Sequence, residues 1–464
     1  MWAVEHDCAA HNPQPTTHNP VPPIVAHVHY PRRLKLSAPP PEHDSNVPPS
    51  LVFQEVPAPP RGWGPVFRAL RHRNFRLFAT GQIISLVGTW MQAVAQSWLV
   101  YRLTRSELLL GATGFCTHLP VFLFGPLGGL AADRYSRHKL VLITQTLSMC
   151  QAFALAALTL TGKVQVWQVL ALAFTLGMVN AFDMPGRQSL LIQLTGKEDL
   201  LNAISLNSTI FNAARVLGPA LAGVLVAGLG EGVCFLLNAL SFLAVIACLA
   251  AMRLAPFQLR APDSPWAHLV DGYRYVHRTR PIRILLGLMA VATIAGMPAL
   301  VLMPFFADDI FRRGSQGLGF LMGAMGTGAV IGTLVLARRT HTAGLPDVIF
   351  ASSLGVGAGF ILFSLSPSFY LSLAIMPVIG FSVMRQNASA NTVIQVSIPD
   401  EYRGRIMALY SMTVVGMGPF GSLAAGALAQ RIGARMTVLL GGVLCLIAAT
   451  VFRLRYPRPR PERN

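Results

Sequence analysis

The sequence predicts an all-α membrane protein, with twelve transmembrane helices in two pseudo-symmetric six-helix bundles. Of the 464 residues, 53% are apolar and only 12% are charged, which is too few charges to cover a soluble globule of this length. From Phe75 onward, apolar runs alternate with short polar breaks, and each run has the roughly 20 residues that a helix needs to cross a bilayer. Short sequence pairs also recur at offsets of 198 to 202 residues.

Residues 1–65 differ from the rest of the chain. Fourteen of the 33 prolines and six of the twelve histidines lie within residues 1–60. No long apolar run follows, so this composition predicts a disordered, extended tail. The histidines lack the regular spacing of metal ligands, and we expect no metal site there.

Twelve apolar runs are long enough to span the membrane. They are residues 75–100, 108–132, 140–160, 165–186, 204–228, 232–253, 283–306, 316–337, 345–365, 369–390, 406–429 and 435–454. The polar gap at 254–282 separates one bundle at 66–253 from another at 283–456, and 457–464 form a basic tail. Within the gap, apolar residues at helical spacing predict an interfacial helix. They are Trp266, Leu269, Val270, Tyr273 and Val276.

The distribution of Lys and Arg predicts the orientation. With the N-terminus inside, the cytoplasmic segments near the helices hold 26 of these residues and the opposite side holds seven. By the positive-inside rule, both termini are then cytoplasmic. The net charge of +18 is spread over these loops, so we do not expect nucleic-acid binding.

Three residue pairs recur in the two halves, around and within the fifth span of each. They are Arg187-Gln188 with Arg385-Gln386, Ile192-Gln193 with Ile394-Gln395, and Gly218-Pro219 with Gly418-Pro419. Parallel repeats of this kind are an architecture of transporters, with a substrate site between the repeats. The two Gly-Pro pairs are expected to bend their helices.

The loop after the second span contains Gly129, Asp133, Arg134 and Arg137. A glycine one turn before Asp133 would let a neighbouring helix approach closely. The carboxylate of Asp133 would then lie at the membrane edge, where it could cap the positive end of another helix. A charged stop between two helices explains the same residues equally well.

This Gly-x-x-x-Asp-Arg-x-x-Arg pattern, with twelve spans and a central loop, resembles the major facilitator superfamily over residues 66–456. Ser136 stands where that family usually has glycine. The segments 180–188 (Asn-Ala-Phe-Asp-Met-Pro-Gly-Arg-Gln) and 403–405 (Arg-Gly-Arg) are similar to the enterobactin-exporter-like branch. The resemblance implies the major facilitator fold, a bacterial inner membrane, and export of siderophores or drugs coupled to proton entry.

The resemblance also implies a cytoplasmic latch. In it, Asp133 engages the start of the eleventh span near Arg405, and Arg137 pairs with Asp183 at the end of the fourth. Gly129 and Arg134 belong to the same loop.

Two spans carry a polar stripe along one face. The first holds Gln82, Ser85, Thr89, Gln92 and Gln96, spaced by three or four residues. Such a stripe either joins helices or lines a wet cavity, and the resemblance favours the cavity. The fifth span holds Ser205, Ser208, Asn212 and Arg215. An arginine near mid-bilayer costs at least about 2.5–3.5 kcal/mol, so Arg215 needs water, a hydrogen-bond partner or bound substrate.

Proton coupling would need a titratable group inside the bundle. The possible carriers are Asp183, His118 and Asp308, the last as part of the Asp308-Asp309 pair. Each also has a structural explanation. Asp183 belongs to the latch, His118 would be a hydrogen-bonded packing residue, and the Asp pair would be a solvated helix cap.

The motifs of nucleotide-binding loops and hydrolases are absent from the sequence. We therefore expect neither an enzyme nor a cofactor, but a monomeric carrier in a lipid bilayer that exports an amphipathic small molecule by alternating access, with proton antiport implied by the resemblance. The alternatives are uptake, facilitated diffusion or lipid movement by the same fold, and a non-transporting scaffold or sensor.

Overall fold

The computed structural model describes residues 67–195, 199–254, 273–339, 342 and 344–457. Every regular element in these residues is helical, and twelve helices are long and apolar enough to cross a membrane, which confirms the predicted fold class. The proposed tail at 1–65 and the basic tail from 458 onward lie outside the described residues. So does most of the proposed interfacial helix, of which residues 273–278 are described and are helical.

The first six spans follow one another with short connections. After η1 (Arg68–Arg71) they are α2 (Arg73–Thr104), α3 (Glu107–Arg134), α4 (Arg137–Leu160), α5 (Val166–Thr195), α6 (Leu200–Leu229) and α7 (Glu231–Ala250). Between α2 and α3 the chain turns within two residues, because Arg105 adopts a left-handed backbone conformation (φ 48°) and Ser106 caps α3 by accepting a hydrogen bond from the Leu109 amide.

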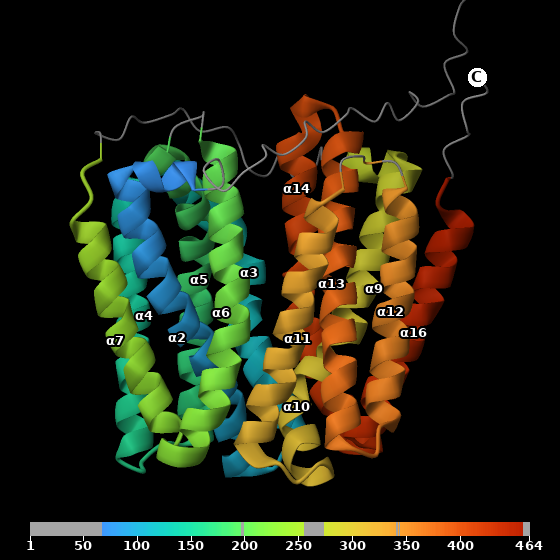
Figure 1. The fold of residues 1–464 in the computed structure, drawn as a ribbon, viewed down its shortest axis with the longest axis horizontal. Helices are drawn as coiled ribbons and strands as arrows, with labels where there is room; N and C mark the ends of the chain where they lie inside the picture. The colour runs from blue at the N-terminus through green and yellow to red at the C-terminus, as the bar shows by residue number, and fades with distance from the viewer. Residues whose placement is uncertain (1–66, 196–198, 255–272, 340–341, 343, 458–464) are drawn as a thin grey trace, which may run out of the picture. The chain divides into compact units, whose positions relative to one another are not determined.

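The remaining spans include two that are interrupted. They are α9 (Arg280–Val301) with α10 (Met303–Phe305) and the π-helix η2 (Phe306–Ile310), α11 (Gly314–Ala337), α12 (Leu345–Leu365), α13 (Phe369–Ser397), α14 (Asp400–Val414) with α15 (Gly418–Ile432), and α16 (Ala434–Arg455). Figure 1 shows the helices in two groups, α2 to α7 and α9 to α16.

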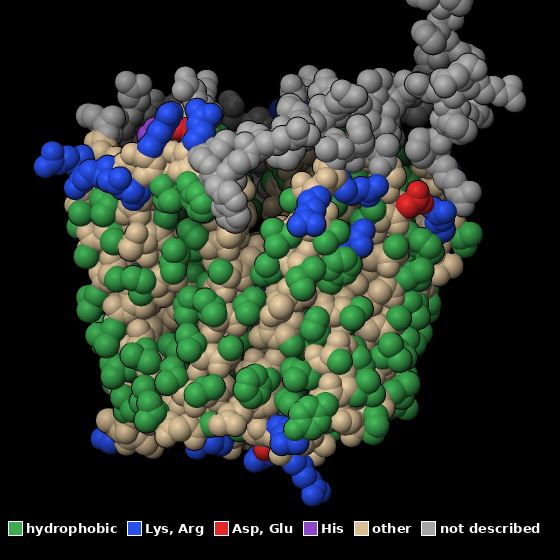
Figure 2. Space-filling model, viewed as in Figure 1, with side chains coloured by type: hydrophobic (Ala, Val, Ile, Leu, Met, Phe, Trp, Pro, Cys, Tyr) green, Lys and Arg blue, Asp and Glu red, His purple; other side chains and the backbone are tan. Residues whose placement is uncertain are grey.

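The two ends of the helices define two faces. We call the face where α2 begins and α16 ends the tail face, and the one where α2 ends and α11 begins the opposite face. In Figure 2, Lys and Arg side chains gather near these two faces, with a broad, mostly uncharged band between them. This is the surface of a chain that spans a bilayer.

Two glycine-rich seams join the groups. In the α6–α11 seam, a Cβ added to Gly223 would lie 2.9 Å from the Gly319 Cα. In the α3–α15 seam, one added to Gly111 would lie 2.9 Å from the Gly426 Cα. These glycines lie toward the opposite face, and Gly326 extends the first seam to mid-depth, against the Arg215 carbonyl. A further contact between the groups lies near mid-depth, where a Cβ added to Gly416 would lie 2.5 Å from the Phe122 ring of α3.

Candidate functional site

The polar stripe of α6 lies on the side of this helix that faces the other group. Gly218 packs against Trp90 of α2, and Gly223 packs against α11, so the stripe lies between these two contacts. Its tail-face half is open, because Ser205 and Ser208 are exposed. On the other side of α6, Leu217, Leu221 and Val224 form the exposed lipid-facing surface.

Arg215 stands at the deep end of this stripe, where the α6–α11 seam begins. Its Cζ lies 5.5 Å from the centre of the Trp90 ring, and Trp90 meets Phe211 edge to face at 5.7 Å. Among the described residues it makes no ion pair or hydrogen bond. One turn earlier, Asn212 donates to the Ser208 carbonyl at 2.8 Å, while its buried Oδ1 has no partner in the described part.

The stripe of α2 has a different role in this structure. Gln82, Ser85, Gln92 and Gln96 are buried, and Thr89 donates to the Ser85 carbonyl of its own helix. Gln92 donates to Gln151 of α4 at 3.0 Å and accepts from Asn238 of α7 at 2.7 Å. These bonds favour the alternative in which the stripe joins helices.

Asp183 is the centre of a second polar network inside the first group. This carboxylate is only 1% exposed and accepts hydrogen bonds from Thr144 at 2.7 Å and Gln145 at 2.8 Å. It also pairs with Arg187, one turn along α5, and Arg187 donates to Gln82 at 2.8 Å. The network therefore connects α2, α4 and α5.

The expected pairing of Arg137 with Asp183 is absent from this conformation. Arg137 Nε instead donates to the Ala132 carbonyl at 3.4 Å. Sequence reasoning missed Arg187 as the partner of Asp183, although their i,i+4 spacing on one helix is a direct signal of such a pair.

The other latch residues are also apart in this conformation. Asp133 and Arg134 are exposed, and no hydrogen bond or ion pair joins Asp133 to a described residue. Gly129 has open space around it, and the close helix approach occurs at Gly128, against Ala181 of α5. The Arg405 guanidinium lies 5.7 Å from the centre of the Tyr402 ring.

A clasp between the two groups lies at the opposite face, and we define it by Tyr101, Arg105, Asp308 and Asp309. The hydroxyl of fully buried Tyr101 donates to Asp308 at 2.7 Å. Arg105 donates to Asp308 at 2.8 Å and to Asp309 at 3.2 Å. The expectation of a solvated pair agrees with the Asp309 side chain, which is 46% exposed, but it omits Arg105, from which both carboxylates accept hydrogen bonds.

The remaining intramembrane positions lie near the α3–α15 seam or within α6. His118 lies beside Gly418, 3.9 Å from a Cβ added there, and makes no hydrogen bond to a described residue. Gly418 and Pro419 begin α15 after a turn at residues 415–417. Pro219 lies inside α6, whose helical structure continues through it.

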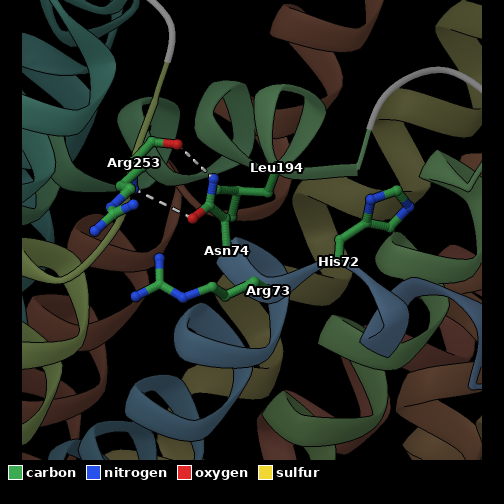
Figure 3. Close-up of a pocket in the computed structure, with 5 residues that line it drawn as sticks. All are labelled: His72, Arg73, Asn74, Leu194 and Arg253. Atoms are coloured by element: carbon green, nitrogen blue, oxygen red, sulfur yellow. Dashed lines mark hydrogen bonds between the residues drawn. The ribbon is translucent and has the colours of Figure 1, made fainter.

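A pocket of about 420 Å³ opens on the tail face of the first group. It is lined by His72, Arg73, Asn74, Leu194 and Arg253. Figure 3 shows the Asn74 side chain bonded twice to the Arg253 backbone, donating to its carbonyl at 2.8 Å and accepting from its amide at 3.3 Å. These bonds join the start of α2 to the residues that follow α7.

Asp199, between α5 and α6, lies beside this pocket and is 2% exposed. A hydrogen bond of 2.8 Å joins it to His72, and its carboxylate lies 2.7 Å from Arg71 and 3.4 Å from Arg68. The His72 hydrogen bond and the nearby arginine charges hold the pKa of this carboxyl below its usual range. In the described part, no group of three or more His, Cys, Asp or Glu side chains could hold a metal.

Comparisons with known proteins agree with this architecture. The chain is 26% identical to a staphyloferrin A transporter of Staphylococcus aureus, over 81% of this chain and 95% of the relative. It is 26% identical to a multidrug efflux pump of Mycolicibacterium fortuitum, over 78% and 91%, and 24% identical to an enterobactin exporter of Shigella boydii, over 84% and 95%. Its fold is similar to that of a nucleoside transporter, with a TM-score of 0.67 at 14% identity, over 83% and 99% of the two chains.

The family model described as transmembrane secretion effector matches residues 64–463. This match covers both groups of helices and confirms the resemblance seen in the sequence. The chain therefore belongs to the transmembrane secretion effector family of major facilitator transporters.

Proposed function

We propose that this transporter exports an amphipathic small molecule, of siderophore or drug type, across a bacterial cytoplasmic membrane by alternating access. One observation carries the proposal: the seams and the clasp close the molecule from mid-depth to the opposite face, while the polar side of α6 stays exposed toward the tail face. If the tail face is cytoplasmic, substrate enters this conformation from the cytoplasm. The multidrug efflux pump and the enterobactin exporter among the relatives support the direction.

The latch would form in the other state, with the opposite face open. Asp133 would then meet the start of α14 near Arg405, and Asp183 would exchange Arg187 for Arg137. Each contact at a wet membrane edge is worth roughly 0.3–2 kcal/mol, which shifts a conformational equilibrium several-fold. Arg137→Asp should impair transport, and adding Asp183→Arg should restore part of it. A double variant no better than either single one contradicts the pairing.

Proton antiport is the energy source that we propose. Of Asp183, His118 and Asp308, we favour Asp308, because a proton arriving from the outside would neutralise the carboxylate that holds the clasp. Protonation would favour opening toward the outside, and antiport requires that the same proton leave toward the cytoplasm after the opposite face has closed again. Asp183 is less suitable, because its hydrogen bonds inside the first group stabilise the charged carboxylate. His118, near the α3–α15 seam, is the remaining candidate.

Flux measurement tests the function. Cells that lack the transporter should accumulate its substrate from a panel of siderophores and drugs, and proteoliposomes should move that substrate faster with an imposed pH gradient. Faster accumulation in cells that contain the protein would favour uptake. Movement without any effect of the gradient would indicate facilitated diffusion, and the absence of flux for every compound would favour a scaffold or sensor.

A further inference from the structure

Arg215 is a half-buried cation, and no described residue supplies a counter-charge. It lies halfway along α6, a membrane-spanning helix, and its only described interaction is with the Trp90 ring. Arg187, another arginine within a span of the first group, is neutralised by Asp183. Arg102 is exposed at the opposite face and pairs with Glu231. A cation at this depth requires water or an anion, so the position favours a negatively charged ligand.

Asn212 adds a second requirement. Its side chain is 7% exposed, and its Oδ1 is a buried hydrogen-bond acceptor with no partner in the described part. An unmatched acceptor of this kind costs about 1–3 kcal/mol. Asn212 lies one turn from Arg215 on the same side of α6. A hydroxyl or N–H group of a ligand held by Arg215 could therefore donate a hydrogen bond to the Asn212 Oδ1.

Aromatic surface completes the environment. The rings of Trp90 and Phe211 meet edge to face beside the guanidinium. The seam starts directly behind Arg215, where Gly326 meets its carbonyl. A ligand that entered along Ser205 and Ser208 would therefore stop at Arg215, with its apolar part against these rings.

We propose that Arg215, Asn212 and Trp90 form the substrate-recognition point, and that the substrate class is an organic oxyanion with a hydrogen-bond donor near its charge and an aromatic or apolar body. This inference rests on the proposed transport function. The inference narrows the substrates of the proposed transport function to anionic amphipathic compounds.

Equilibrium binding to the purified full-length protein in nanodiscs tests the inference separately from flux. The probes are radiolabelled 3-hydroxybenzoate, benzoate without the donor, and 3-hydroxybenzamide without the charge. We expect 3-hydroxybenzoate to bind most tightly and the amide at least tenfold more weakly. Arg215→Met should abolish the preference for the acid, Arg215→Lys should keep part of it, and Asn212→Ala should remove only the advantage over benzoate.

Arg313→Met is the matched control. Arg313 also lies over aromatic rings, those of Phe369 at 5.6 Å and Tyr370 at 5.4 Å, but it is exposed and lies at the opposite face. This variant should bind all three probes like the unmodified protein. Equal affinity for acid and amide, or Arg215→Met with an unchanged melting temperature and unchanged binding, would overturn the inference. Neither result would contradict the proposed transport function, because flux in proteoliposomes tests that function independently.

Discussion

Gln92 is the side chain through which α2 is bonded to two other helices at once. Its amide donates to Gln151 and accepts from Asn238, so its two polar ends have different helices as partners. The sequence showed that these glutamines share one face of a helix. It could not show which neighbour that face meets, because periodicity identifies a side of a helix and not what lies against it. For the same reason, the spacing of the polar residues in α6 could not show that their side faces the other group of helices.

Replacing Gln92 with Leu should lower stability by about 1 kcal/mol, because the Asn238 donor is left unpaired in an apolar interior. Thermal unfolding in detergent measures this loss. Thr175→Ala is the control, since Thr175 is exposed and bonds only to the Ala171 carbonyl of its own helix. Equal melting temperatures for both variants would show that the network contributes nothing to stability.

Asp199 should make stability depend on acid pH. Its pKa is lowered in the folded protein, so its contribution is complete above the unfolded-state value of about 3.9 and is lost as pH falls through the folded-state pKa. Melting temperature measured from pH 6 to pH 3 should therefore fall less steeply in Asp199→Asn than in the unmodified protein. Asp133→Asn, at an exposed position without described partners, should leave the profile unchanged. Parallel profiles for all three proteins would contradict this role.

Helices α6 and α11 meet almost backbone to backbone, and the reason is local sequence. Glycines at 223 and 319 remove the side chains that would hold the helices apart.

The sequence predicted the twelve spans well, because hydropathy is averaged over about 20 residues. It predicted a bend at Gly418-Pro419, where the eleventh span is interrupted, but it did not predict the interruption in the seventh span. The two outcomes have the same origin. These depend on single prolines and glycines, such as Pro304 and Pro419, whose effects vary with packing, since α6 continues through Pro219.

Gly223→Ala should hinder closure of the opposite face. The new Cβ would lie 2.9 Å from the Gly319 Cα, which forces the backbones to separate. Transport should fall at least several-fold, and a single cysteine at Ser315 in the same seam should react faster with an impermeant thiol reagent. Gly228→Ala on the same helix is the control, because no atom lies within 4 Å of its added Cβ. Normal transport by Gly223→Ala would show that the seam tolerates separation.

The whole molecule has a closed end and an end where the stripe of α6 is exposed, and only three-dimensional contacts reveal which is which. Tyr101 and Asp308 are 207 positions apart in the chain, so no local pattern could join them. The latch motif, by contrast, was visible in the sequence, but its residues are separated in this conformation. The sequence therefore predicts a contact at the tail face, and the structure shows one at the opposite face.

Weakening the clasp should shift the protein toward the state open at the opposite face. Tyr101→Phe removes the hydroxyl that donates to Asp308, and Asp308→Asn removes the charge that attracts Arg105. Each change should raise labelling of a cysteine at Ser315 about two- to tenfold, as expected for the loss of about 0.5–1.5 kcal/mol. Asp347→Asn, which among the described residues disrupts the pair with Arg453 on the tail face, should not change the labelling. Unchanged labelling in both clasp variants would exclude the clasp as a gate.

Orientation in the membrane is testable with the same reagent in a background without the native cysteines. If the tail face is cytoplasmic, cysteines at Ser136 and Arg338 should be protected in intact cells, and one at Lys163, in the exposed connection between α4 and α5, should react. The basis is the excess of Lys and Arg on the tail-face segments. The reverse pattern would invert the topology.

The two bonds between Asn74 and the backbone of Arg253 join the beginning of the first span to the residues that follow the sixth. During synthesis, this connection becomes available as soon as residue 253 leaves the ribosome. The first six helices then have all the described partners of the Gln92 and Asp183 networks, before α9 to α16 have left the ribosome. The nascent chain can thus complete one half while the other is still being translated, and the glycine seams are assembled last, between two halves that have already folded.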